Sequence, residues 1–152
     1  MRRFAKTVNF GIVYGMSPYG LSSDLGIPVD EAKAYIDNYF LHYKGVKEFI
    51  DKTIAEAKEK GYVTTMLNRR RQIPELQSAN GATRNFGERM AVNTPIQGSA
   101  ADLIKMAMIN IDKRLDKERL KSIMILQVHD ELVFKVIENK LEIIKELVKK
   151  EM

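Results

Sequence analysis

Four side chains near the start of the chain recur at every fourth residue and could together hold a ligand. On a helix this spacing turns each side chain only about 40° from the one before, so the set forms one stripe. The stripe consists of Arg2, Lys6, Phe10 and Tyr14. The cations can hold phosphate oxygens, and the rings can stack on a base or sugar. This arrangement suits a nucleotide; the alternative is an amphipathic helix with solvated cations and core rings.

Acidic residues follow an apolar run near the other end of the chain. Residues 123–128 and 132–136 are rich in strand-forming side chains, and His129, Asp130 and Glu131 stand between them. Carboxylates at a hairpin tip are often turn formers that face water. The preceding strand is too apolar for a surface ribbon, however, and a rigid strand holds a metal ligand in place. Both interpretations remain open from the residues alone.

The composition limits which metals and partners are possible. The chain has no cysteine and two histidines, so disulfides, thiolate sites and histidine-rich zinc sites are excluded. Any metal must be held by oxygen ligands, which favours magnesium or manganese. Lysine and arginine total 25 against 20 acidic residues, a net charge of +5 that permits a polyanionic partner. No apolar run could span a bilayer and no signal peptide is evident, so we expect a cytoplasmic protein without a membrane partner.

The elements that must position these residues are mostly helical. Residues 1–15 are predicted to be a helix, because Phe4, Val8 and Ile12 repeat on the side opposite the stripe. A loop with about one helical turn should follow at 15–28, because the segment is rich in glycine, proline and serine. Helices are expected at 28–43, 45–60, 80–93 and 139–152, and a short hairpin at 62–74 with arginines at its tip.

One proline makes the middle of the chain harder to interpret. Pro95 should interrupt or start a helix, because it lacks a backbone donor. That helix continues to about residue 120. Its predicted buried residues are Leu103, Met106, Ala107, Ile109, Ile111 and Leu115.

Two segments resemble motifs of one enzyme family. Residues 2–15, RRFAKTVNFGIVYG, resemble motif B of family A DNA polymerases of the bacterial DNA polymerase I type, and residues 127–132, QVHDEL, resemble motif C. The resemblance extends over nearly all 152 residues. Single-subunit RNA polymerases have related motifs but fit less well, because Phe10-Gly11 together with QVHDE follows the DNA polymerase I pattern.

The resemblance implies template-directed DNA synthesis. Its partners would be primer–template DNA and deoxynucleoside triphosphates, and its cofactor magnesium (Mg2+), with manganese (Mn2+) possible. Nucleotide transfer to a primer 3′ end would proceed by two-metal phosphoryl transfer. Asp130 would hold metal with Glu131 beside it, and Lys6 would be a candidate proton donor to pyrophosphate. The nucleotide-binding residues would be Arg2, Lys6, Phe10 and Tyr14. The DNA-binding residues would be Arg69, Arg70, Arg71, Arg89, Asn93, Gln97 and His129.

The resemblance also implies the architecture. We expect a mainly helical α+β fold made of fingers helices and part of an antiparallel palm sheet that carries the motif C hairpin. Residues 1–92 would be mostly fingers, and residues 93–152 a partial palm. Motif A and the thumb have no counterpart here, so we expect the chain alone to be inactive and its hairpin to have unpaired edges. The alternatives are a non-catalytic DNA-binding module derived from the fingers, and a helical scaffold that binds no nucleic acid.

Overall fold

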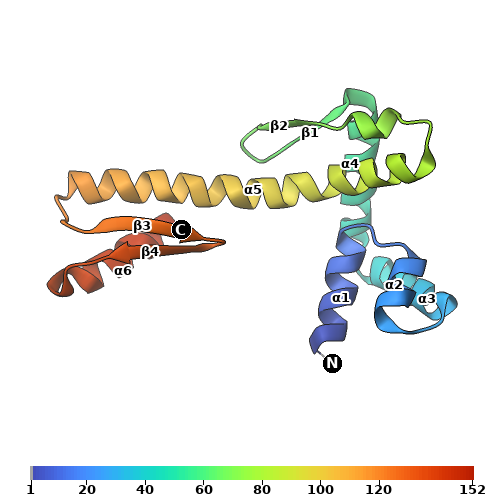
Figure 1. Cartoon of the computed structure of the whole chain (residues 1–152), viewed down its shortest axis with the longest axis horizontal. Helices are drawn as coiled ribbons and strands as arrows, with labels where there is room; N and C mark the ends of the chain where they lie inside the picture. The colour runs from blue at the N-terminus through green and yellow to red at the C-terminus, as the bar shows by residue number, and fades with distance from the viewer. Residues whose placement is uncertain (1) are drawn as a thin grey trace. The chain divides into compact units, whose positions relative to one another are not determined.

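The protein is a mainly helical α+β chain with two separate two-stranded antiparallel sheets (Figure 1), as predicted. The computed structural model describes the backbone from Arg2 to Met152 and the side chains from residue 5 onward. The side chain of Arg2, predicted to bind a nucleotide, therefore lies outside the described part. The chain forms two compact units, Met1–Gly98 and Ser99–Met152. The assignment of residues 1–92 to fingers and 93–152 to palm remains a prediction.

The first unit begins with four helices and continues into a hairpin. The elements are α1 (Arg2–Val13), α2 (Pro18–Leu25), α3 (Val29–His42), α4 (Lys44–Lys60), β1 (Tyr62–Thr64), β2 (Arg70–Gln72), the 3-10 turn η1 (Pro74–Gln77) and α5 (Gly81–Lys117), which runs on into the second unit. The second unit then contains β3 (Ile123–Val128), β4 (Glu131–Lys135), η2 (Glu138–Lys140) and α6 (Leu141–Glu151). None of the described helices combines the length and the hydropathy that crossing a membrane requires.

The segment at 15–28, predicted to be a loop with about one helical turn, contains the longer helix α2, so the length of the helix was underestimated. Ser17 is its N-cap and accepts a hydrogen bond from the Gly20 backbone N–H (3.1 Å), and Pro18 occupies the first turn. Gly26 ends the helix in the left-handed conformation (φ 67°). These are standard helix start and stop signals. Glycine, proline and serine are also common in loops, so these start and stop signals did not predict the full length of the helix.

The β1–β2 hairpin packs against α4 and the first turns of α5. Its core contains Val63 and Ile73 together with Ala57 from α4 and Ala91 from α5. Only three residues pair in each strand, with Val63 opposite Arg71. The hairpin predicted at 62–74 is present, and residues 65–69 form its connecting loop. Asn80 accepts from the N–H groups of Ala82 (2.9 Å) and Thr83 (3.2 Å) at the start of α5.

Helix α5 is continuous through Pro95, so the predicted interruption at this proline does not occur. The predicted buried set was half right. Ala107, Ile111 and Leu115 are buried at every fourth residue, whereas Leu103, Met106 and Ile109 are exposed by about half. The difference arises because the second unit packs against only one side of the helix. Within that unit Ile111 and Leu115 contact α6 and the inner face of the β3–β4 hairpin.

The β3–β4 hairpin has one covered and one open face. Met124 and Phe134 are paired and partly buried on the covered face. The register shifts after Met124, which places one extra residue in β3. Beyond the shift, Leu126 pairs with Val133, and both side chains are exposed on the open face. Among the described residues each strand has one partner, which matches the prediction of unpaired edges.

Candidate functional site

The predicted stripe on α1 is present from residue 6 onward. Lys6 Nζ lies 5.7 Å from the centre of the Phe10 ring, and the Phe10 and Tyr14 rings stack with centroids 6.1 Å apart and planes inclined by 20°. Phe10 is 51% exposed, while Ile12 on the other side of the helix is buried. The helix therefore directs one cation and two rings to the same accessible face, where a flat, charged ligand could bind.

This face forms one wall of a pocket of about 640 Å³. Lys6, Phe10 and Tyr14 line it together with Ser17 and Asp24 from the α2 region. The volume is that of a typical small-molecule site. The sequence did not predict that residues of the α2 region line this pocket. The available signal was Ser17-Pro18, which marks the start of a helix at this point.

Arg89 from α5 also lines the α1 pocket. Arg89 was predicted to contact DNA, and nothing in the local spacing of the sequence places it beside the nucleotide stripe. Gly15 permits this approach: its φ is 75°, and an added Cβ would lie 3.3 Å from Arg89 Cγ. The guanidinium stands 5.8 Å from the Phe86 ring centre. The pocket therefore has a second cation besides Lys6.

The three arginines at the hairpin have different partners. Arg69 Nη2 donates to the Gly98 carbonyl (3.2 Å), and Arg71 Nη1 donates to Thr94 Oγ1 (3.1 Å). The Arg70 guanidinium lies 4.9 Å from the ring centre of Tyr62 on the paired strand. Two of the arginines therefore connect the hairpin to α5, while all three residues remain exposed.

A cleft of about 250 Å³ lies between this hairpin and α5. It is lined by the three arginines and by Asn93, Thr94 and Gln97. The structure thus brings together five of the seven predicted DNA-binding residues. Asn93 Oδ1 is buried and has no hydrogen-bond partner among the described residues. A buried acceptor without a partner is costly, and the residue that carries it, Asn93, lines the cleft.

The acidic hairpin lies in the second unit and has a tight turn. Val128 pairs with Glu131, so His129 and Asp130 form the turn and Glu131 is the first residue of β4. His129 has φ 55°, which non-glycine residues adopt infrequently. Gln127 Nε2 donates to the His129 carbonyl (2.7 Å) and braces the turn. The three predicted residues are therefore adjacent and exposed.

Asp130 and Glu131 are the oxygen donors available at this turn, and their chemistry suits magnesium or manganese. The exposed carboxylates at this braced turn are accessible to a hard cation. No three histidine, aspartate or glutamate side chains gather into a metal site within the described part of the chain. The turn can therefore contribute part of a metal site.

Comparison with known proteins identifies the family. The family model for DNA polymerase family A matches residues 1–152, the whole chain. This chain belongs to DNA polymerase family A. DNA polymerase I of Bacillus subtilis (strain 168) is 56% identical over 148 residues, which are 97% of this chain and 17% of the relative. DNA polymerase I of Bacillus caldotenax is 54% identical over 142 residues, 93% of this chain and 16% of the relative.

A solved structure of the family has the same fold. The POL domain of Pol1 from M. smegmatis, in complex with DNA primer-template and dNTP, matches with a TM-score of 0.95 and 44% sequence identity. The match covers 99% of this chain and 26% of that one. The family A chain described here therefore spans about a sixth of the length of the DNA polymerase I relatives.

Proposed function

We propose that this chain provides the nucleotide-binding and DNA-contacting part of a DNA-directed DNA polymerase, which adds deoxynucleotides to a primer 3′ end. The observation that carries the proposal is the α1 pocket, where Lys6, Phe10, Tyr14 and Arg89 line one cavity. Family membership supports it, as does the M. smegmatis relative, which holds DNA primer-template and dNTP.

The α1 residues would each contact a different part of the substrates. Lys6, with Arg2, would hold the triphosphate oxygens, and Phe10 would pack on the sugar. Tyr14, stacked on Phe10, would occupy the template slot. Lys6 is also the candidate donor of a proton to the leaving pyrophosphate. Such a reaction depends mainly on positioning and charge neutralisation, which a rigid helix with ligands on one face can supply.

The hairpin–α5 cleft would contact the primer–template. Arg69, Arg70 and Arg71 would bind phosphates, which positions a duplex without reading its sequence. Asn93 and Gln97, which both line the cleft, would reach the minor-groove side of the primer–template. His129 would lie close to the primer end.

Asp130 would hold the catalytic magnesium, or manganese in its place, with Glu131 beside it. The metal, when bound, would supply charge stabilisation at the reacting phosphate. Because two-metal chemistry needs more carboxylates than this turn offers, we propose that motif A of a longer polymerase supplies them. We therefore expect no DNA synthesis by the 152-residue chain alone.

The proposal is tested by equilibrium binding. A fluorescent primer–template ending in a dideoxynucleotide is titrated with the chain, with and without the next complementary nucleotide. Lys6→Ala should weaken nucleotide binding by about 10-fold or more, because a charged hydrogen bond contributes about 1.5–3 kcal/mol. Lys33→Ala, at an exposed position of α3, is the matched control. Failure of the parent chain to bind primer–template would overturn the proposal.

Primer extension separates the catalytic part from the alternative. Extension by the parent chain that disappears in Asp130→Ala would contradict the expected dependence on motif A. DNA binding that is sensitive to salt, needs no metal and survives Asp130→Ala would favour a non-catalytic DNA-binding module.

A further inference from the structure

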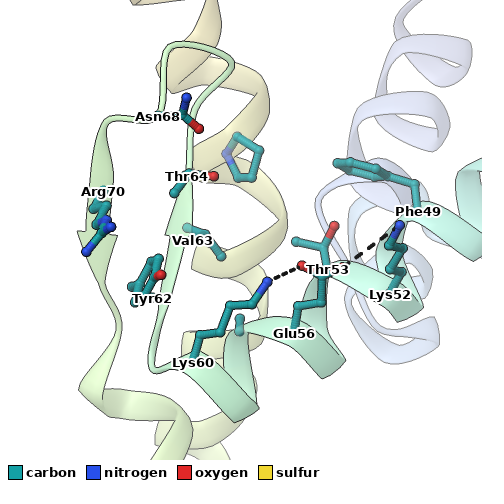
Figure 2. A pocket seen from close by; sticks show the side chains of 12 residues that line it. Phe49, Lys52, Thr53, Glu56, Lys60, Tyr62, Val63, Thr64, Asn68 and Arg70 are labelled. Atoms are coloured by element: carbon teal, nitrogen blue, oxygen red, sulfur yellow. Dashed lines mark hydrogen bonds and ion pairs between the residues drawn. The ribbon is translucent and has the colours of Figure 1, made fainter.

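The arginines of the β1–β2 hairpin point in two directions. Side chains two residues apart in an extended chain point the same way, and the one between them points the opposite way. Arg69 and Arg71 accordingly both bond α5. Arg70 instead lies over the Tyr62 ring (4.9 Å), and both residues line a pocket of about 510 Å³ that the hairpin forms with α4 (Figure 2).

Arg71 uses both of its terminal nitrogens on one face of α5. Nη1 donates to Thr94 Oγ1 (3.1 Å) and Nη2 to Met90 Sδ (3.3 Å), and these two side chains are four residues apart, so they lie one turn apart on the same side. Arg69 Nη2 bonds the next turn at the Gly98 carbonyl (3.2 Å). The planar guanidinium is a rigid fork that suits two partners at once, whereas a lysine ammonium is a point charge on a flexible stem.

The bonded stripe spans Pro95, a residue that normally weakens a helix. Proline has no backbone N–H, so the carbonyl of Ala91 lacks its usual donor, and a proline inside a helix commonly produces a kink. Helix α5 nevertheless runs without interruption through this point. Arg71 bonds the turn before Pro95 and Arg69 the turn after it, so the hairpin holds α5 on both sides of the proline.

Asn93 and Gln97 lie beside this stripe. Each precedes a bonded residue by one position, so its side chain points about 100° round the helix axis from that residue. Both side chains line the cleft between the hairpin and α5. A bend or rotation of α5 at Pro95 would turn both amides together, and their direction therefore depends on the bonds that hold the helix there.

We propose that Arg71 is a positioning residue, which fixes the direction of the Asn93 and Gln97 amides by holding α5 beside Pro95. The inference rests on the proposed function, in which these amides reach the minor-groove side of the primer–template and Arg71 also binds phosphate. The positive charge is sufficient for the phosphate contact, whereas holding α5 requires the fork and the Thr94 hydroxyl. The two roles can therefore be separated by a variant that keeps the charge.

The test measures, by fluorescence anisotropy, the affinity of the 152-residue chain for a primer–template whose primer end is matched or mismatched, at several salt concentrations. Correct base pairs present similar minor-groove acceptors in either orientation, so correctly directed amides should favour the matched end. Arg71→Lys keeps the charge and loses the fork. Its salt dependence should equal that of the parent, while its preference for the matched end should fall about three-fold or more, the effect of one lost hydrogen bond.

Thr94→Val should reproduce this loss, because it removes the acceptor of Arg71 at a position that is only 9% exposed. The double variant should lose no more preference than either single variant, since both act on one bond. Arg84→Lys is the matched control: Arg84 is also on the first-unit part of α5 and donates to the Ser78 carbonyl (3.2 Å), away from Pro95. This variant should keep the preference of the parent.

Two results overturn the inference. One is a preference in Arg71→Lys equal to that of the parent, and the other is a loss in Arg71→Lys that Thr94→Val does not share, since Arg71 would then act directly on DNA. A parent chain that binds no primer–template contradicts the proposed function, and one that binds both ends equally gives no preference to lose. In either case NMR of the free chain decides the inference. The side-chain amide resonances of Asn93 and Gln97 should move alike in Arg71→Lys and Thr94→Val, and unmoved resonances overturn it.

Discussion

Gly98→Ala is the substitution whose effect the structure determines most directly. Alanine in place of glycine inside a helix normally stabilises a protein by about 1 kcal/mol. At Gly98, however, an added Cβ would lie 2.7 Å from Thr65 Cγ2 of the hairpin loop. Real Cβ atoms do not tolerate this separation, so the hairpin or the helix must shift.

Thr65 cannot easily turn its methyl group away. It is 5% exposed, its N–H donates to the Arg69 carbonyl (3.0 Å), and its Oγ1 accepts from the Arg69 N–H (3.2 Å). A rotation would break the second of these bonds. Overpacking of this kind costs about 1–3 kcal/mol. Set against the helix-propensity gain of about 1 kcal/mol, the expected net loss of unfolding free energy ranges from near zero to about 2 kcal/mol.

Urea denaturation of the parent, Gly98→Ala, Thr65→Ser and the double variant measures this coupling. Thr65→Ser removes the Cγ2 methyl and retains the hydroxyl, so in that background Gly98→Ala should stabilise by about 1 kcal/mol. The double-mutant cycle should give a coupling of about 1–3 kcal/mol. Gly45→Ala, where nothing lies within 4 Å of an added Cβ, is the control and should stabilise. Stabilisation of the parent by Gly98→Ala to the same degree as by Gly45→Ala would refute the reasoning.

Three other outcomes are expected. Asn80→Ala should lower the unfolding free energy by about 1 kcal/mol, because its side chain caps α5 through two N–H groups. Ile73→Ala should cost about 2–5 kcal/mol, because this side chain is fully buried in the hairpin core. The hydrogen bond from Lys60 lowers the pKa of Glu56; an NMR titration should show this pKa rising towards the usual glutamate value in Lys60→Gln. The stabilisation that accompanies the lowered pKa is present above the ordinary carboxyl pKa and lost as the pH falls through the lowered one.

Each of these has a contradicting result. Asn80→Ser retains a capping oxygen and should remain close to the parent; an equal loss in Asn80→Ser and Asn80→Ala would show that capping is not the cause. Ile73→Val should cost far less than Ile73→Ala, and equal costs would argue against cavity formation. A Glu56 pKa that does not respond to Lys60→Gln would contradict the pairing.

The sequence predicted α1, the four long helical segments and both hairpins correctly in type, because local periodicity and turn residues determine them. Its errors have physical causes. Helix α2 is longer than the one helical turn predicted, because glycine and serine are common in loops as well as at helix ends. Pro95 was expected to break a helix, yet α5 continues through it. Burial on α5 was only partly predicted, because a spacing of three and four residues defines a stripe but does not say how wide the packed side is.

The candidate site was predictable as a set of residues and not as an arrangement. The sequence by itself determined that Lys6, Phe10 and Tyr14 share one helix face, because a four-residue spacing fixes their direction. It also predicted a turn at His129, Asp130 and Glu131 between two strands, of which Glu131 proved to be the first residue of β4. Only the tertiary structure placed Arg89 in the α1 pocket and left Asn93 Oδ1 buried, without a partner among the residues that the structure describes. Contacts between residues far apart in the chain depend on how elements pack, and no local spacing encodes that.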